Sequence, residues 1–223
     1  MVGEGSVARV RIRLPHRLHR LLGRLVRSSQ RLAAEVGIVG PDDDLAKRFG
    51  AFGQGSALLF PQGVIYNERY LRIGAGTMVG PNVCLTAGMG PGQPMLTDPV
   101  VTIGDRCIIG RGSHIIGHWS IELGDDIQTG PYVYVTDQNH GYEDPGSPIG
   151  WQRTVERPVK IGSGCWLGAN AVILPGTELG ENCVVAAGAV VRGTFPDHCV
   201  VAGVPARIVR KLEDGEWRRP PAT

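Results

Sequence analysis

The fold of this chain is decided by residues 161–196, which read in sixes as Ile161-Gly-Ser-Gly-Cys-Trp, Leu167-Gly-Ala-Asn-Ala-Val, Ile173-Leu-Pro-Gly-Thr-Glu, Leu179-Gly-Glu-Asn-Cys-Val, Val185-Ala-Ala-Gly-Ala-Val and Val191-Arg-Gly-Thr-Phe-Pro. An aliphatic residue opens every block. A helix requires an apolar period of 3.6 residues and a half-buried strand a period of 2, so a period of six fits neither alone. It is typical of short strands that end in tight turns and stack as the coils of a parallel β-helix. A small residue fills the fifth place of the first five blocks: Cys165, Ala171, Thr177, Cys183 and Ala189.

The steric reason is the narrow interior of a triangular coil. Each of its three sides takes about six residues and admits one aliphatic and one small side chain, while Gly or Asn reaches positive φ cheaply at the corners. The spacing recurs upstream, so we predict a mainly β protein whose β-helix domain covers residues 51–210. The upstream positions that show the spacing are Ile73, Val79, Leu85, Ile103, Ile109, Ile115, Leu123, Thr129 and Val135.

Two long segments leave the repeat and are predicted to be loops, at about residues 88–100 and 137–160. Extra residues around His118-Trp119 also shift the phase of the repeat. Long loops on a rigid scaffold often carry functional sites. Residues 50–55 read as a linker, Asp42-Asp43-Asp44 as the cap of a short helix that follows them, and residues 211–223 as a frayed polar tail.

Residues 1–50 form a separate basic segment in which 14–36 are predicted to be an amphipathic helix. Apolar residues recur there at spacings of 3 and 4, and Gly37 and Gly40-Pro41 end the pattern. The first 31 residues contain eight arginines (9, 11, 13, 17, 20, 24, 27 and 31) and one acid, Glu4, although the whole chain has a net charge of only +2. The apolar positions of the helix are Leu14, Leu18, Leu21, Leu22, Leu25 and Val26.

Four partners are possible for this helix. It could pack on the β-helix or on a neighbouring subunit, or its basic face could contact an anionic membrane surface. Binding to nucleic acid has the least support, because the segment contains no aromatic residue.

The five cysteines show no CxxC pair, and three of them fall at small inward places of the repeat. We therefore expect buried, reduced thiols rather than metal ligands or disulfides. The odd number of cysteines and the absence of an export signal predict a cytoplasmic protein, and no apolar run approaches the roughly 20 residues needed to span a membrane. The cysteines are Cys84, Cys107, Cys165, Cys183 and Cys199.

His140 is the best candidate for a catalytic group. It follows Thr136-Asp137-Gln138-Asn139 at the start of the second loop, where polar neighbours make a core position unfavourable. A histidine in such a loop can accept a proton near neutral pH.

Residues 57–210, most clearly those after 160, resemble the hexapeptide-repeat O-acetyltransferases, such as the galactoside, maltose and polysaccharide-biosynthesis acetyltransferases. The resemblance is carried by Gly-Cys-Trp166-Leu-Gly-Ala169-Asn, Leu-Pro-Gly-Thr-Glu-Leu-Gly-Glu-Asn, Ala-Ala187-Gly-Ala-Val-Val and Val-Ala-Gly-Val-Pro-Ala-Arg207. It implies a left-handed parallel β-helix, a homotrimer with active sites at subunit interfaces, acetyl-CoA as the acyl donor and no required metal. It also implies a catalytic histidine in the loop upstream of the Trp motif, where His140 matches.

The same resemblance implies how CoA is held. Trp166 would line the site near the pantetheine thiol, the backbones of Ala169 and Ala187 would bond the CoA arm, and Arg192, Arg207 and Arg210 would face the phosphates. Many relatives have Thr-Lys where this chain has Arg192-Gly193, which places that charge one residue earlier.

The acceptor pocket is predicted around His140, and a saccharide is the expected acceptor because sugars are held by polar and aromatic side chains. Two alternatives stay open. The γ-class carbonic anhydrases share the left-handed β-helix and bind zinc through three histidines, and a β-helix can also serve as a non-catalytic scaffold. The residues expected in the acceptor pocket are Tyr132, Tyr134, Asp137, Asn139, Tyr142, His114 and His118.

Overall fold

The computed structural model describes residues 15–219, and its internal contacts divide the chain into Met1–Val36 and Gly37–Thr223. The first unit contains the helix α1 (His16–Val36), close to the predicted bounds. Its α-helical course follows from the apolar spacing, with Pro15 before the first turn, where its missing N–H costs nothing. The predicted apolar position Leu14 and the charged residues Glu4, Arg9, Arg11 and Arg13 lie outside the described residues.

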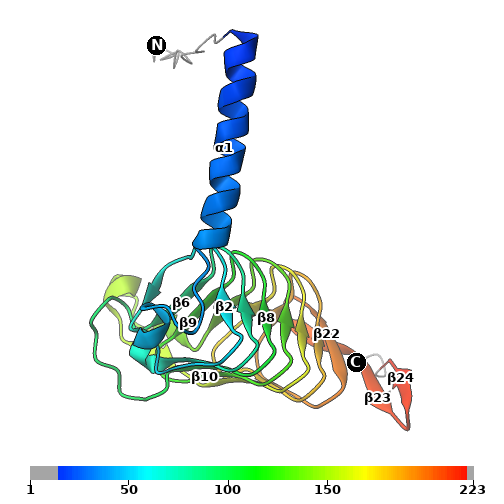
Figure 1. Ribbon diagram of the computed structural model, residues 1–223. Coiled ribbons are helices and arrows are strands. Elements are labelled where there is room, and N and C mark those ends of the chain that lie inside the picture. Colours follow the sequence, from blue (N-terminus) through cyan, green and yellow to red (C-terminus); the bar gives the residue numbers. More distant parts are fainter. Residues whose placement is uncertain (1–14, 220–223) are drawn as a thin grey trace, which may run out of the picture. The chain divides into compact units, whose positions relative to one another are not determined.

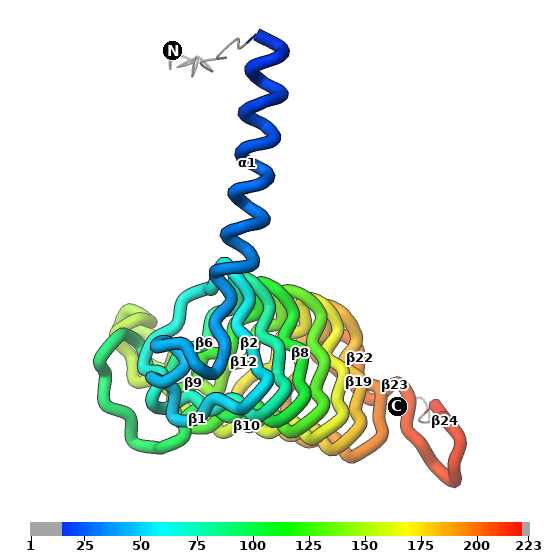
Figure 2. Tube along the Cα trace, in the orientation of Figure 1, coloured from blue at the N-terminus to red at the C-terminus, as the bar shows by residue number. Residues whose placement is uncertain are grey.

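The second unit is a left-handed parallel β-helix built from three sheets, as Figures 1 and 2 show. The chain passes from the first sheet to the second and then the third, and each turn of this path adds one coil. The first sheet has seven strands: β1 (Ala51–Phe52), β4 (Leu71–Ile73), β7 (Val101–Ile103), β10 (Ile121–Leu123), β15 (Val159–Ile161), β18 (Glu178–Leu179) and β21 (Thr194–Phe195).

The second sheet has nine strands, of which the last two are joined to the sheet by antiparallel pairing. They are β2 (Ala57–Leu58), β5 (Met78–Val79), β8 (Ile108–Ile109), β11 (Gln128–Thr129), β16 (Trp166–Leu167), β19 (Val184–Val185), β22 (Cys199–Gly203), β23 (Ala206–Glu213) and β24 (Glu216–Arg218). The third sheet has six: β3 (Ile65–Tyr66), β6 (Cys84–Ala87), β9 (His114–Gly117), β12 (Tyr134–Thr136), β17 (Val172–Ile173) and β20 (Val190–Val191).

The core confirms the period of six. Every residue that opens a block between 161 and 196 is buried, and so is every small residue at the fifth place. Four of the five cysteines are buried thiols, as expected, while Cys84 is half-buried on β6. Successive coils bring the sulfurs of Cys183 and Cys199 to 3.5 Å.

Glycine at the second place of a block lets successive coils approach closely. A Cβ atom on Gly162 would lie 2.6 Å from the backbone carbon of Gly180 in the next coil. This contact is much shorter than van der Waals distance, so the repeat requires glycine at 162 for packing between coils rather than for a special φ.

Three predictions about the two ends of the β-helix were wrong, namely the linker, the capped short helix and the frayed C-terminal tail. Residues 51–52 form β1 and pair with β4, so the stretch 50–55 belongs to the β-helix instead of being a linker. The short helix after Asp42-Asp43-Asp44 is only the 3₁₀ turn η1 (Ala46–Arg48), and no side chain caps it. Asp43 instead accepts a hydrogen bond from the backbone N–H of Gly40.

The expected frayed tail was also wrong for residues 211–218. They continue β23 and form β24, joined by a two-residue turn at Asp214-Gly215 in which both residues have positive φ. An Asp-Gly pair between two strand-like runs is a strong sequence signal for this hairpin turn, and the sequence contains it.

Candidate active site

The second predicted loop leaves the β-helix at Asp137 and returns at β15. Its base is a short hairpin of β13 (Gln138–His140) and β14 (Thr154–Glu156), in which His140 pairs with Thr154. Two further contacts close the base, because the backbone N–H of Arg157 donates to the carbonyl of Asp137 and that of Gly141 to the carbonyl of Arg153. The tip carries the 3₁₀ turn η3 (Ile149–Trp151).

His140 is exposed and lines a hollow of about 350 Å³ over the third sheet. The hollow also contains Asn139, Tyr134 and His118, so four of the predicted site residues meet there. Its walls are mixed polar and apolar, with groups that can hydrogen-bond a hydroxylated ligand. The lining residues that the sequence analysis did not single out are Tyr66, Gly88, Met89, Ile116, Thr136, Gln138 and Leu174.

The hollow is assembled from different coils, which explains why the missed residues gave no sequence signal. Tyr66 pairs with Thr86, and Thr86 pairs with Ile116, so the stacking of β3, β6 and β9 brings distant positions together. The buried hydroxyl of Thr86 has no hydrogen-bond partner among the described residues.

Asp137 is buried and does not line the acceptor pocket in which it was expected. Its side chain is 0% exposed, and its two carboxylate oxygens accept hydrogen bonds from the backbone N–H groups of His118, Trp119 and Ser120 at 2.7–2.8 Å. Burial raises the pKa of Asp137, while these three N–H donors oppose the rise. The carboxylate therefore holds the extra residues after β9 instead of facing an acceptor.

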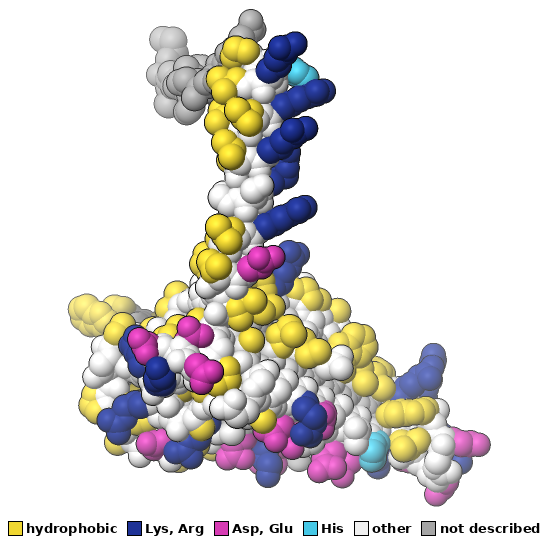
Figure 3. All heavy atoms as spheres, viewed as in Figure 1, with side chains coloured by type: hydrophobic (Ala, Val, Ile, Leu, Met, Phe, Trp, Pro, Cys, Tyr) yellow, Lys and Arg dark blue, Asp and Glu magenta, His cyan; other side chains and the backbone are white. Residues whose placement is uncertain are grey.

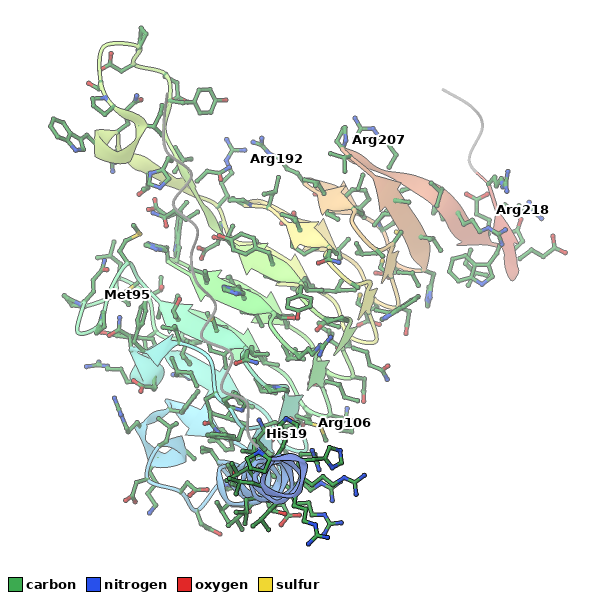
Figure 4. The ribbon with its side chains drawn as sticks, turned by 90° about the horizontal axis from the view of Figure 1, so that it is seen from above. His19, Met95, Arg106, Arg192, Arg207 and Arg218 are labelled. Atoms are coloured by element: carbon green, nitrogen blue, oxygen red, sulfur yellow. The ribbon has the colours of Figure 1, made fainter. Side chains whose placement is uncertain are left out.

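His118 lies between the hollow that contains His140 and a second one of about 340 Å³. The second hollow runs between the two excursion loops and includes Met95, which Figure 4 marks, together with Trp119 and Arg153. Burial lowers the pKa of His118, and the negative charges of Asp137 and Glu156 partly offset this effect.

The remaining members of the predicted acceptor pocket do not line the hollow around His140. Tyr132 occupies a corner with φ of 60° and its ring lies 5.7 Å from the guanidinium of Arg111. His114 pairs with Tyr134 on the third sheet, with ring centroids 6.4 Å apart. Tyr142 is exposed next to the hairpin. The clustering expected around His140 is thus only partly present in this chain.

Trp166 lies elsewhere, exposed on the second sheet between Gln128 and Val184. Ala169 and Ala187 occupy the corners that lead from the second sheet to the third. They stack in successive coils, because the N–H of Gly188 donates to the carbonyl of Ala169. Within residues 15–219 the N–H groups of Ala169 and Ala187 make no hydrogen bond, so both are available as donors.

The three arginines expected at the phosphates are exposed near the C-terminal end of the β-helix. Figure 4 shows Arg192 and Arg207 projecting to the same side. Arg210 pairs in register with Val200 on β22. None of the three guanidinium groups forms an ion pair with another described residue.

No group of three or more His, Cys, Asp or Glu residues between 15 and 219 is arranged to hold a metal ion. No helix in the same range is long and apolar enough to cross a bilayer.

Comparison with known families agrees with this fold. A model described as bacterial transferase hexapeptide (six repeats) matches residues 158–193, and one described as hexapeptide repeat of succinyl-transferase matches residues 100–136. Both matched segments lie in the β-helix and are made of its six-residue repeats.

Individual relatives are more specific. The chain is 35% identical to the putative lipopolysaccharide biosynthesis O-acetyl transferase WbbJ of Escherichia coli, over 64% of this chain and 75% of that protein. It is 36% identical to a probable acetyltransferase of Mycobacterium tuberculosis over 49% of this chain, but spans only 37% of that longer protein. The chain therefore belongs to the hexapeptide-repeat acetyltransferases, and it is an acyltransferase.

A solved relative has the same architecture. The hexapeptide-repeat acetyltransferase of Vibrio cholerae, determined in complex with acetyl-CoA, is 26% identical and superimposes with a TM-score of 0.50 over 75% of this chain and 74% of that one. The predicted family and fold are thus confirmed, and family membership favours acyl transfer over the zinc-enzyme and scaffold alternatives.

Proposed function

We propose that this protein transfers an acetyl group from acetyl-CoA to a hydroxyl of a saccharide or glycan precursor, with His140 as the general base. The observation that carries the proposal is the position of His140, exposed in a hollow with Tyr134, Asn139, Gln138 and His118. This lining offers several donors and acceptors to a polyol. The name of the WbbJ relative, an O-acetyl transferase of lipopolysaccharide biosynthesis, supports the same acceptor class.

The chemistry needs a base because a hydroxyl is a poor nucleophile at neutral pH. In the proposed step His140 accepts the hydroxyl proton as the oxygen attacks the thioester carbonyl. The tetrahedral intermediate then collapses with cleavage of the C–S bond, and the protonated imidazole returns the proton to the leaving thiolate. No covalent intermediate on the enzyme and no metal ion is required.

The acetyl-CoA donor is supported by the arrangement along the second sheet. The unbonded N–H groups of Ala169 and Ala187 suit the amide carbonyls of a pantetheine arm, and Trp166 exposes its aromatic side chain on β16, the strand that precedes the corner of Ala169. The unpaired guanidinium groups of Arg192, Arg207 and Arg210 suit phosphate. The acetyl-CoA complex of the Vibrio relative supports the same donor.

A homotrimer is proposed for a geometric reason. Within one subunit, Trp166 lies on the second sheet, whereas the hollow at His140 lies over the third. A neighbouring subunit that packs against a corner of the β-helix brings the Trp166 surface of one subunit to the His140 hollow of the other. Three such contacts close a ring. The five unpaired thiols fit a reducing compartment, so we place the enzyme in the cytoplasm.

The function is tested by CoA binding and by thiol release from acetyl-CoA with a panel of mono- and oligosaccharides. The proposal expects saturable CoA binding and thiol release that increases with at least one sugar. If the protein binds CoA but no sugar increases thiol release, the donor assignment stands and the sugars in the panel are excluded as acceptors. A protein that binds no CoA would refute the proposal.

A further inference from the structure

Within its own unit, the helix α1 has an apolar face that no other described residue of that unit covers. None of its residues is buried, and the exposed fractions of Leu25 and Leu32 are 58% and 60%. A contiguous exposed patch of this kind indicates an interaction surface. The face consists of Leu18, Leu21, Leu22, Leu25, Val26, Leu32 and Val36.

The opposite side of the same helix is strongly basic. Five arginines follow one another at spacings of 3 and 4, so they form a single stripe, and Glu35 is the helix's one acid. No ion pair between described residues involves this stripe. Figure 3 shows the arginines along one side of the helix and the hydrophobic side chains along the other. The basic stripe consists of Arg17, Arg20, Arg24, Arg27 and Arg31.

We propose that α1 binds in the plane of an anionic lipid bilayer. The apolar face would enter the boundary between headgroups and acyl chains, while the basic stripe stays among the anionic headgroups. A helix is about 10–12 Å wide, and the Debye length is about 10 Å at 0.1 M salt. Arginines on the side of the helix that faces away from the bilayer are therefore still attracted by its negative surface charge.

Charge decides between a bilayer and another copy of the chain. Packing the apolar faces of several copies together would cover the leucines but would leave the five arginines of each helix, with its single glutamate, without an anionic partner. Nucleic acid would satisfy the arginines but would leave the leucines exposed to water. An anionic bilayer satisfies both faces at once.

The test is sedimentation of the full chain with vesicles of phosphatidylcholine, with or without phosphatidylglycerol. One variant, Leu21→Ser with Leu25→Ser, changes the apolar face. The other, Arg20→Gln with Arg24→Gln and Arg27→Gln, changes the stripe while keeping good helix formers. The matched controls make the same changes on the β-helix unit, Leu96→Ser at a fully exposed leucine and Arg218→Gln on β24.

We expect the wild type to bind only the vesicles that contain phosphatidylglycerol and to lose affinity as salt rises. Both α1 variants should bind at least tenfold more weakly, and both controls should bind as the wild type does. Absence of wild-type binding, or equal binding by either α1 variant, would overturn the proposal. If Leu21→Ser with Leu25→Ser lowers the oligomeric mass while the wild type ignores vesicles, the face belongs to another copy and the proposal fails. Equal binding of a DNA duplex by the wild type and the leucine variant, without vesicle binding, would overturn it as well.

Discussion

The buried carboxylate of Asp137 accepts a hydrogen bond from the backbone N–H of Trp119 at 2.8 Å, which ties the first residue of the long excursion to the bend after β9. The same carboxylate also accepts from the N–H groups on either side of Trp119. His118 belongs to this bend and His140 follows Asp137 by three residues, so one side chain anchors both histidines of the hollow.

Replacing Asp137 with alanine should therefore destabilise the fold. The change leaves three backbone N–H groups without their acceptor, and we expect the free energy of unfolding to fall by about 2 kcal/mol or more. Urea denaturation measures the loss. Asp144→Asn is the control, because Asp144 makes its hydrogen bonds within the exposed tip of the loop. Equal stability of Asp137→Ala and the wild type would contradict the anchoring role.

His118 should make stability depend on pH. Burial lowers its pKa in the folded protein, so the folded state binds fewer protons than the unfolded state, whose histidine has a pKa of about 6.5. The contribution of His118 to the free energy of unfolding is fully present above the unfolded pKa. It is lost as the pH falls through that value towards the lowered pKa of the folded protein. Denaturation of both proteins at pH 8 and pH 6 should show that lowering the pH reduces the free energy of unfolding less in His118→Asn than in the wild type. The same loss in both proteins would refute the assignment.

The coil contact at Gly162 predicts a large cost for a single methyl group. In Gly162→Ala the new Cβ meets the backbone of Gly180, and overpacking of this kind costs about 1–3 kcal/mol. Thermal unfolding should show a clear decrease in Tm. Gly150→Ala is the matched control, since a Cβ there would meet no atom within 4 Å. Equal Tm values for the two variants would contradict the close contact between the coils at Gly162.

The proposed phosphate contacts predict a change in ligand discrimination. Arg192→Gln and Arg207→Gln should each weaken CoA binding by about tenfold or more, because a charge-assisted hydrogen bond contributes about 1.5–3 kcal/mol. At least one of them should bind CoA and 3′-dephospho-CoA with more similar Kd values than the wild type does. Arg106→Gln, whose wild-type guanidinium pairs with Asp126 at 2.7 Å, is the control. Unchanged Kd values in both variants would place the phosphates elsewhere.

The coils could be predicted from sequence because one physical rule repeats. Ile161, Leu167 and Ile173 lie at the start of successive blocks and all three are buried, since the narrow interior accepts an aliphatic side chain at that place and few others. The antiparallel end of the second sheet lacks the period of six, and its signal was the local Asp214-Gly215 turn.

The candidate site was harder to predict than the fold. His140 was identifiable because a loop position with polar neighbours is visible in the sequence. The burial of Asp137 was not, because an acid in a loop is usually exposed. Tyr66 and Leu174 enter the hollow only because distant coils stack, and their outward positions carry no periodic pattern.

The most direct test of the central claim compares acceptor-dependent thiol release by the wild type, His140→Ala and His198→Asn. His198 is exposed in a corner with φ of 51°, and asparagine tolerates that conformation, so this control should keep wild-type kcat. Loss of a general base typically costs about 10²–10⁴ in rate, so His140→Ala should lose at least a hundredfold in kcat while its Kd for CoA stays unchanged. Wild-type kcat in His140→Ala would contradict the proposed mechanism.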